Sequence, residues 1–444
     1  MTARQQYSLT ASPGVSLPVA VRASGLRIWD AEGNEYLDAC GGAMVTTLGH
    51  RHPRLVTAAQ RQLDLLTFTY RFSFSNEPML ELAELVREIA PMPDAWAFFN
   101  SSGSESIESA IHLALLYWQH RGRPSKTEVI GRFPSFHGST FAALGLSGSK
   151  WRQSFEAVLD DNAVAQAPCA DIRSGRTQAE EEAFGLAEIE RAIVERVAQN
   201  VAAVFLEPIT GASGAAVVPP DGYLRGVRSL CDQYDVLMIC DETITGFGRT
   251  GKWWAVDHWG VAPDLLTFAK GVTSGITPFS GLVVAAGVAD VFNATPQGFP
   301  YGHTFSGNPL GCAVAAEAIR VIGDDDLLAQ ATAMGERLRD GLERLAASSP
   351  LVGQVRGLGL LQGVELVADA SLRPLAGGAS RLTELARVRR LMIYACPTPM
   401  NDEVIEAVLL APPLVVTSQE VDEIVERLGA ALDELEVSSP DTRS

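Results

Sequence analysis

The feature that most constrains this chain is a series of short apolar runs separated by longer stretches with helical spacing. Residues 201–206 and 236–240 are apolar throughout, and residues 265–268 and 282–286 are similar. A strand that is apolar at every position is buried on both faces, and such strands alternating with helices form a parallel sheet between helical layers. The pattern therefore predicts an α/β fold with a mostly parallel sheet.

The two ends of the chain differ from this central part. Apolar alternation around a turn at residues 30–34 predicts a hairpin within residues 26–38. After about residue 310 we expect one long helix, then a smaller α+β region with strand-like segments at 358–366 and 408–410. An amphipathic helix is predicted over 418–435, and the charged stretch 171–182 is predicted to be a surface loop.

These patterns predict four segments. They are an N-terminal arm with part of a small domain (1–50), a large domain (51–310), a C-terminal small domain (311–437) and a disordered tail (438–444).

Composition excludes several classes of function. The chain has 35 basic and 53 acidic residues, a net charge of −18 that repels nucleic acid and anionic membranes. Its six cysteines are scattered, with no CxxC pair and no zinc-ligand spacing, which predicts reduced thiols in the cytoplasm and no metal site. The first ten residues lack the apolar core of a signal peptide, and no apolar run approaches the roughly 20 residues of a membrane helix.

Two motifs that follow predicted strands could bind a flat anionic ligand. Ser102-Gly103-Ser104 opens a predicted helix, so backbone N–H groups and hydroxyls could face an anion; the alternative is an ordinary serine N-cap. Phe136 in Phe136-His137-Gly138 could stack on a heterocycle or be a core residue.

Two ionisable residues also follow apolar strands. Asp241 comes directly after residues 236–240, where a carboxylate is costly unless it is paired, for example with a protonated pyridine nitrogen, a helix N-terminus or a cation. Lys270, one of only four lysines, follows residues 265–268. Lost hydration there would lower its pKa and make it an amine nucleophile; the alternative is an exposed lysine at a strand end.

Taken together, the motifs identify a family. From Gly25 to about Leu435 the chain resembles the class III (omega-type) aminotransferases, pyridoxal-phosphate (PLP) enzymes of fold type I. The motifs stand in the order of that family: Leu48-Gly49-His50, Ser102-Gly103-Ser104-Glu105, Phe136-His137-Gly138, Glu207-Pro208, Asp241-Glu242, Thr245 to Gly251, Lys270-Gly271 and His303 to Pro309. The resemblance implies a large domain with a seven-stranded, mostly parallel sheet, a small α+β domain built from both chain ends, and a homodimer with shared active sites.

The resemblance also implies roles for single residues. Lys270 would hold PLP as a Schiff base and shuttle the substrate proton, and Asp241 would pair with the pyridine nitrogen. Ser102, Gly103 and Ser104 would bind the phosphate, and Phe136 would stack on the ring. Thr304 would reach the phosphate of the neighbouring subunit's cofactor. His137, Glu207 and Thr243 complete the implied cofactor-binding set.

The chain departs from the family pattern where substrate carboxylates are bound. Relatives that act on ornithine-like or 4-aminobutyrate-like substrates carry an Arg at the position of Leu409, where it binds a substrate carboxylate, and Leu cannot make that contact. The Arg that amine-type relatives carry near the strand 392–394 is also missing, since Ala395, Cys396, Pro397 and Thr398 stand there. The enzyme therefore either prefers an amine without an α-carboxylate or recruits another cation, Arg71 or Arg152. The predicted substrate pocket is apolar and comprises Met44, Val45, Tyr70, Phe72, Trp151 and Leu409.

The leading hypothesis is a ping-pong transfer of an amino group from an amine or amino acid to a keto acid or aldehyde. A racemase, aminomutase or decarboxylase would use the same fold and cofactor. A non-catalytic protein of this fold is a third possibility, which the intact Lys270 and Asp241 disfavour.

Overall fold

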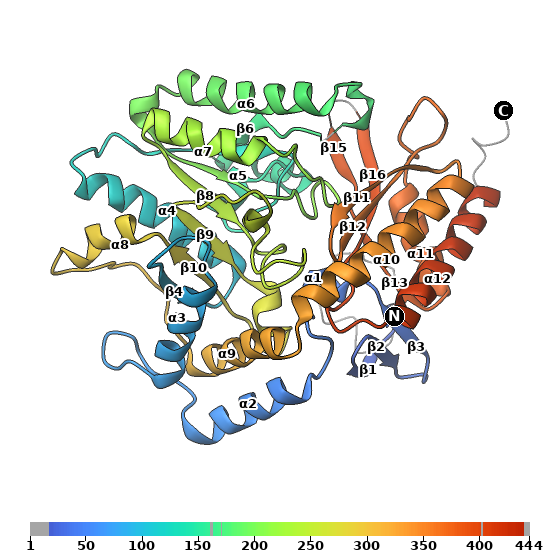
Figure 1. Cartoon of the computed structure of the whole chain (residues 1–444), viewed down its shortest axis with the longest axis horizontal. Helices are drawn as coiled ribbons and strands as arrows, with labels where there is room; N and C mark the ends of the chain where they lie inside the picture. Colours follow the sequence, from blue (N-terminus) through green and yellow to red (C-terminus); the bar gives the residue numbers. More distant parts are fainter. Residues whose placement is uncertain (1–16, 160–162, 170, 401–402, 439–444) are drawn as a thin grey trace.

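A seven-stranded sheet forms the centre of the molecule. The computed structural model describes residues 17–159, 163–169, 171–400 and 403–438 (Figure 1). The strand order is β4 (Trp96–Asn100), β10 (Ser280–Val284), β9 (Leu265–Phe268), β8 (Leu237–Asp241), β7 (Val201–Leu206), β5 (Glu128–Phe133) and β6 (Ala163–Gln166). Only β10 runs antiparallel to its neighbours; the other pairs are parallel. The mostly parallel sheet expected from the apolar runs is confirmed.

The apolar runs are continuous because both faces of the sheet are covered. In β7, Val204 and Leu206 belong to one hydrophobic cluster, whereas Ala203 and Phe205 belong to another. Successive strand residues point to opposite faces, so each cluster takes every second residue. A polar residue at any of these positions would be buried between the sheet and a helical layer.

Helices cover both faces (Figure 1). One cluster includes residues of α4 (Gly103–His120), α5 (Phe141–Leu146) and α8 (Ala286–Asn293). The other includes residues of α2 (Pro53–Leu65), α3 (Glu77–Ile89), α6 (Gln178–Glu195), α7 (Tyr223–Tyr234) and α9 (Pro309–Asp324). No helix in the described ranges is long and apolar enough to cross a bilayer. All six cysteines are free thiols.

The chain ends form two further sheets beside this layer. An antiparallel sheet contains β11 (Val352–Leu358), β12 (Leu361–Leu366), β16 (Glu403–Leu410), β14 (Tyr394–Ala395) and β15 (Thr398–Met400), with α10 (Leu327–Ser348), α11 (Gly378–Val388) and α12 (Ser418–Ser438) packed nearby. A second sheet contains β1 (Ala20–Ser24), β2 (Arg27–Asp30), β3 (Glu35–Asp38) and β13 (Leu391–Met392).

The small α+β part therefore draws on both ends of the chain, as expected. The predicted hairpin is the antiparallel pair of β2 and β3. β13, from the C-terminal part of the chain, then pairs parallel to β3. The exact domain boundaries stay a prediction.

Two expectations from the sequence are wrong. The loop expected over 171–182 ends where α6 begins, because Thr177 and Glu180 form a capping box that starts the helix. The single long helix after residue 310 is two helices, since Asp326 lies in the left-handed region (φ 49°) between α9 and α10. The strand-like segment expected at 358–366 is mostly β12, which a turn at Gly359 joins to the end of β11.

Candidate active site

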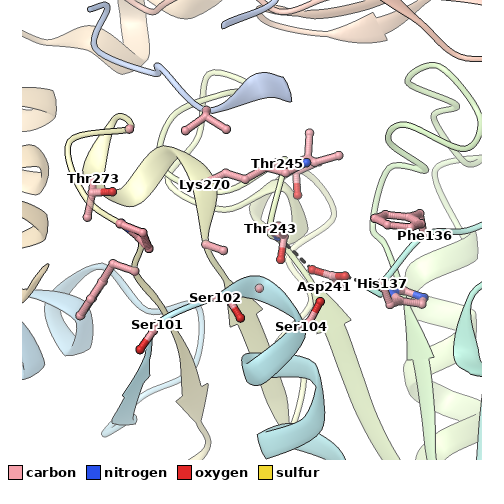
Figure 2. A pocket seen from close by; sticks show the side chains of 18 of the residues that line it. Ser101, Ser102, Ser104, Phe136, His137, Asp241, Thr243, Thr245, Lys270 and Thr273 are labelled. Atoms are coloured by element: carbon pink, nitrogen blue, oxygen red, sulfur yellow. Dashed lines mark hydrogen bonds and ion pairs between the residues drawn. The ribbon is translucent and has the colours of Figure 1, made fainter. Parts of the chain in front are cut away.

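The predicted chemical groups meet at one edge of the central sheet. Strands β4, β5, β7, β8 and β9 all end there, because each has the same direction. The loops that follow them surround a cavity of about 440 Å³ (Figure 2). Nine of the predicted cofactor-binding residues line it: Ser102, Gly103, Ser104, Phe136, His137, Glu207, Asp241, Thr243 and Lys270.

Lys270 stands two residues after β9, at the start of a short 3₁₀ segment (Lys270–Thr273). Its φ of 43° is uncommon for a residue with a Cβ, and strain of this kind concentrates at functional sites. Within the described part of the chain its amine makes no hydrogen bond or ion pair, so it is free to react. Burial lowers the pKa of Lys270 to about 8, although the carboxylates of Asp241 and Glu207 act in the opposite direction.

Asp241 is the last residue of β8, and its carboxylate is buried. His137 Nδ1 lies 2.9 Å from its Oδ2, while the Thr243 amide and the Thr267 hydroxyl each donate to its Oδ1 at 3.0 Å. Burial alone would raise the pKa of Asp241, but the hydrogen bonds from His137 and Thr243 hold it below the usual value of 3.8. The carboxylate is therefore an anion at neutral pH.

The N-terminus of α4 supplies a place for an anion. Ser102 caps the helix by accepting the Glu105 amide at 3.3 Å, and Ser104 Oγ accepts the Ser139 amide at 3.1 Å. The first N–H groups of an 18-residue helix have no intrahelical acceptor and carry its positive dipole end. The two interpretations of this motif, an anion site and a serine N-cap, are thus compatible, since Ser102 caps the helix and also lines the cavity.

The backbone of Phe136 is hydrogen-bonded to the side chain of Glu207, and both residues line the same cavity as Asp241 and Lys270. The Phe136 amide donates to Glu207 Oε2 at 3.3 Å, and the Gly211 amide donates to Oε1 at 3.1 Å. Burial raises the pKa of Glu207. The ring of Phe136 is partly exposed to the cavity, where a flat ligand could contact it (Figure 2).

Several residues expected near the substrate lie elsewhere. Met44 and Leu409 are buried in the core, the latter because β16 packs its side chains inward. Tyr70 is exposed and contacts the ring of Phe72. None of these three residues lines the cavity of the single chain, and their place in a substrate pocket stays a prediction. Trp151 lies in a 3₁₀ segment (Lys150–Val158), and its side chain is outside the described part.

Val45 does line the cavity, as expected. Thr304 is exposed in the loop before α9 and does not line it.

Neither candidate arginine reaches the cavity. Arg71 donates to the carbonyls of Phe299 and Tyr301 at 2.9 and 2.7 Å. Arg152 donates to the carbonyl of Gly145. Among the described residues that line the cavity, Lys270 is the only Lys or Arg.

Sequence reasoning missed Thr267, which fixes one oxygen of Asp241 from the neighbouring strand. Its signal was a hydroxyl inside an otherwise apolar strand, and the parallel register places Thr267 opposite Asp241.

Comparisons with known proteins agree with this geometry. The family described as aminotransferase class-III matches residues 10–432. The chain is 35% identical to a putrescine–pyruvate aminotransferase of Pseudomonas aeruginosa, covering 94% of this chain and 90% of the relative. It is 34% identical to a 5-aminovalerate aminotransferase of the same organism, covering 97% of each.

Among solved structures, an omega transaminase of Pseudomonas jessenii in complex with PMP has a TM-score of 0.90 and 32% identity, covering 99% of this chain and 98% of that one. The chain belongs to the class III aminotransferases. It is a PLP-dependent aminotransferase.

The side chains of this aminotransferase fit PLP. The cofactor needs an amine for its aldehyde, a carboxylate for its ring nitrogen and an anion site for its phosphate. The cavity offers an amine at Lys270 that has no partner among the described residues, a buried anion at Asp241 and the N-terminus of α4.

The lowered pKa of Lys270 predicts unusual reactivity at moderate pH. In the cofactor-free enzyme, arylation of Lys270 by 1-fluoro-2,4-dinitrobenzene should rise with pH and reach half its maximal rate near pH 8, because only the neutral amine reacts. Peptide mass spectrometry after brief exposure between pH 6 and 11 measures this. In Asp241→Asn the midpoint should fall further, since that carboxylate raises the pKa of Lys270. A midpoint near 10.5 would contradict the assignment.

Proposed function

We propose that Lys270 is the residue that binds PLP covalently and carries the proton in transamination. The observation that carries this proposal is its amine, which lines a cavity shared with Asp241 and has no hydrogen-bond or ion-pair partner among the described residues. Bound PLP supplies an electron sink for charge developing on the substrate carbon. With a pKa of about 8, Lys270 can take a proton from that carbon and return it at near-neutral pH.

The other residues around the cavity would hold the cofactor. Anionic Asp241 would pair with the protonated ring nitrogen. Ser102, Gly103 and Ser104 would bind the phosphate at the helix N-terminus. Phe136 and Thr243 would contact the ring.

Reaction with a donor alone tests this assignment. Without any acceptor, the wild-type enzyme should convert about one equivalent of amine per site to the carbonyl product while the visible absorbance of its cofactor falls. Lys270→Ala should slow this half-reaction by about 10³-fold or more. Lys252→Ala, which changes an exposed lysine, is the control and should behave as the wild type. Unchanged absorbance with an epimerised or decarboxylated product would assign a racemase or decarboxylase instead.

The donor is proposed to be a primary amine whose reacting carbon bears no carboxylate. Lys270 is the only Lys or Arg among the described lining residues. A second cavity of about 160 Å³ shares Phe136 with the first and is lined by uncharged groups, including Ser213, Tyr394 and Cys396. A buried carboxylate without a cation is costly. The names of the putrescine and 5-aminovalerate relatives also denote terminal amines. The acceptor would be an aldehyde or a keto acid, and a 2-keto acid would carry the same carboxylate cost as an amino acid donor.

A matched pair of donors tests this specificity. Benzylamine and phenylglycine share a ring and differ by the α-carboxylate. We expect kcat/KM for benzylamine to exceed that for phenylglycine by about 10²-fold, because the carboxylate would be buried without a partner. Steady-state assays with a fixed acceptor measure the ratio. Equal values, or efficient use of ornithine through its α-amine, would contradict the proposal.

We further propose a homodimer in the cytoplasm with shared active sites. Aromatic side chains are exposed together on the segment after α2: Phe68, Tyr70, Phe72 and Phe74. Phe305, next to Thr304, contacts Phe68 with ring centroids 5.6 Å apart. Large exposed apolar patches mark interaction surfaces, and a second chain on this one would bury it. Thr304 would then face the partner's cofactor phosphate.

Charged substitutions on this patch should separate the subunits. Phe72→Asp and Phe74→Asp, at positions 65% and 71% exposed, should shift the enzyme from dimer to monomer in analytical ultracentrifugation and lower its activity with the dimer fraction. Val437→Asp, 73% exposed near the end of α12, is the control and should leave the dimer intact. A fully active monomer would overturn the shared site.

A further inference from the structure

One wall of the second cavity is a loop that follows β7. Residues 210–217, the β7 loop, turn back on themselves: the Thr210 amide donates to the Val217 carbonyl at 3.0 Å, and the Val217 amide donates to the Thr210 carbonyl at 3.1 Å. Ala212 and Ser213, between these ends, line the cavity of about 160 Å³. The conformation of the β7 loop therefore sets the shape of that cavity.

The β7 loop contains two strained residues. Ala215 and Ala216 have φ values of 50° and 61°, in the left-handed region that residues with a Cβ rarely adopt. Both side chains are fully buried. A backbone conformation of this kind persists only where the surrounding structure imposes it. The groups that contact this part of the loop are therefore expected to fix it.

Three consecutive carbonyls of the β7 loop accept hydrogen bonds from the C-terminal sheet. Arg356 of β11 donates from Nε and Nη2 to the Gly214 carbonyl at 3.2 and 2.8 Å, and from Nε to the Ala215 carbonyl at 3.0 Å. Thr398 Oγ1 of β15 donates to the Ser213 carbonyl at 2.7 Å. Arg356 is buried, so its hydrogen bonds are shielded from water.

The other side of the guanidinium fixes Arg356 itself. Nη1 donates to Gln354 Oε1 at 2.9 Å and to the carboxylate of Glu365, which is also buried. Gly363 of β12 lies opposite Arg356 in the strand register, and a Cβ there would overlap the carbonyl oxygen of Ala215. The planar fork thus joins a buried carboxylate of the C-terminal sheet to the carbonyls of the β7 loop.

We infer that Arg356 is a positioning residue, which keeps Ala215 and Ala216 in the left-handed conformation and so fixes the loop wall of the second cavity. The inference rests on the proposed function, since the part of the donor beyond the reacting carbon must enter that cavity. Arg356 lines neither cavity, so it would act through the loop without touching donor or cofactor. A lysine cannot replace it, because one ammonium cannot bond two carbonyls and a carboxylate in the geometry of the fork.

Conservative variants separate the hydrogen bonds of Arg356 from its charge. Arg356→Lys keeps a positive charge beside Glu365 and removes the fork. If this variant does not fold, Arg356→Gln combined with Glu365→Gln leaves no buried charge, and the two side-chain amides can bond each other. Arg339→Lys is the matched control. Arg339 of α10 also donates to a backbone carbonyl, that of Gly357, and pairs with Glu343, but its hydrogen bonds within the described ranges do not involve the β7 loop.

The readout is the ratio of kcat/KM for benzylamine to kcat/KM for ethylamine with one acceptor. The reacting carbon carries a phenyl group in the first donor and a methyl group in the second. In Arg356→Lys we expect the ratio to fall about 10-fold, as for loss of hydrogen bonds to a charged group, because the bulky donor must then order the loop when it binds. The fall should appear in KM, with kcat and the PLP dissociation constant within about threefold of the wild type. Arg339→Lys should keep the wild-type ratio.

Glycine in the loop tests the backbone argument. Ala215→Gly together with Ala216→Gly can adopt positive φ without the penalty of a Cβ. In the wild-type background this double variant should leave the ratio within about twofold of its normal value. In the Arg356→Lys background it should restore the ratio to within about threefold, because the loop no longer needs the fork to hold it.

The outcomes distinguish this inference from the proposed function. A wild-type ratio in Arg356→Lys would overturn the inference, even if that variant melts at a lower temperature. An equal fall in Arg339→Lys, or a fall that the two glycines do not reverse, would overturn it too, since general destabilisation would then explain the loss. If Lys270→Ala leaves the half-reaction intact, the proposed function fails, whatever the ratio of the two donors.

Discussion

The burial of an amine and a carboxylate at one edge of an apolar sheet is the constraint on which the rest of this molecule depends. Asp241 ends β8 and Lys270 follows the adjacent strand β9, and the other residues of the two strands are almost all apolar and buried. Water that would solvate both groups is displaced by the sheet and its helices, so the pKa of Lys270 falls to about 8. The same low-dielectric setting requires that Asp241 receive several hydrogen bonds, which come from His137, Thr243 and Thr267.

The two consecutive acidic residues at the end of β8, Asp241 and Glu242, have different roles. Asp241 lines the cavity, whereas Glu242 accepts the Thr245 hydroxyl and the amides of Ala255 and Val256. Burial raises the pKa of Glu242 to about 7 despite these hydrogen bonds. Side chains of neighbouring extended residues point to opposite sides, so one carboxylate faces the ligand and the other holds the following loop. That loop contains Arg249, which is fully buried.

Arg249 joins the active-site loop to the C-terminal sheet. Its guanidinium donates to the carbonyls of Leu360 and Pro412, which belong to the hairpin after β11 and to the segment after β16. The loop that follows Asp241 is therefore anchored by residues more than 100 positions away. Rigid support of this kind keeps catalytic groups in place within the tolerance that transamination needs.

Much of this site could be predicted because its signals are local. An apolar strand followed by Asp241 or Lys270 can be recognised from a few consecutive residues. The carboxyl ends of parallel strands lie at the same edge of a sheet, so these residues are expected to meet there. Thr267 was missed because its contact depends on the register between β8 and β9. The contact between His137 and Asp241 was equally invisible, since 104 positions separate them. Leu409 could not be recognised as a core residue, because burial depends on how β16 packs against distant elements.

The sequence by itself determined the class of sheet, the family and the groups that perform the chemistry, because periodicity and motifs are properties of short segments. Only the tertiary structure decided which groups are paired and which are free. Among the described residues it left the amine of Lys270 without a hydrogen-bond partner, placed His137 beside Asp241, and kept Arg71, Arg152 and Leu409 out of the cavity lining. Those outcomes depend on distances between segments far apart in the chain, which folding sets through burial, strand register and the need to satisfy buried polar groups.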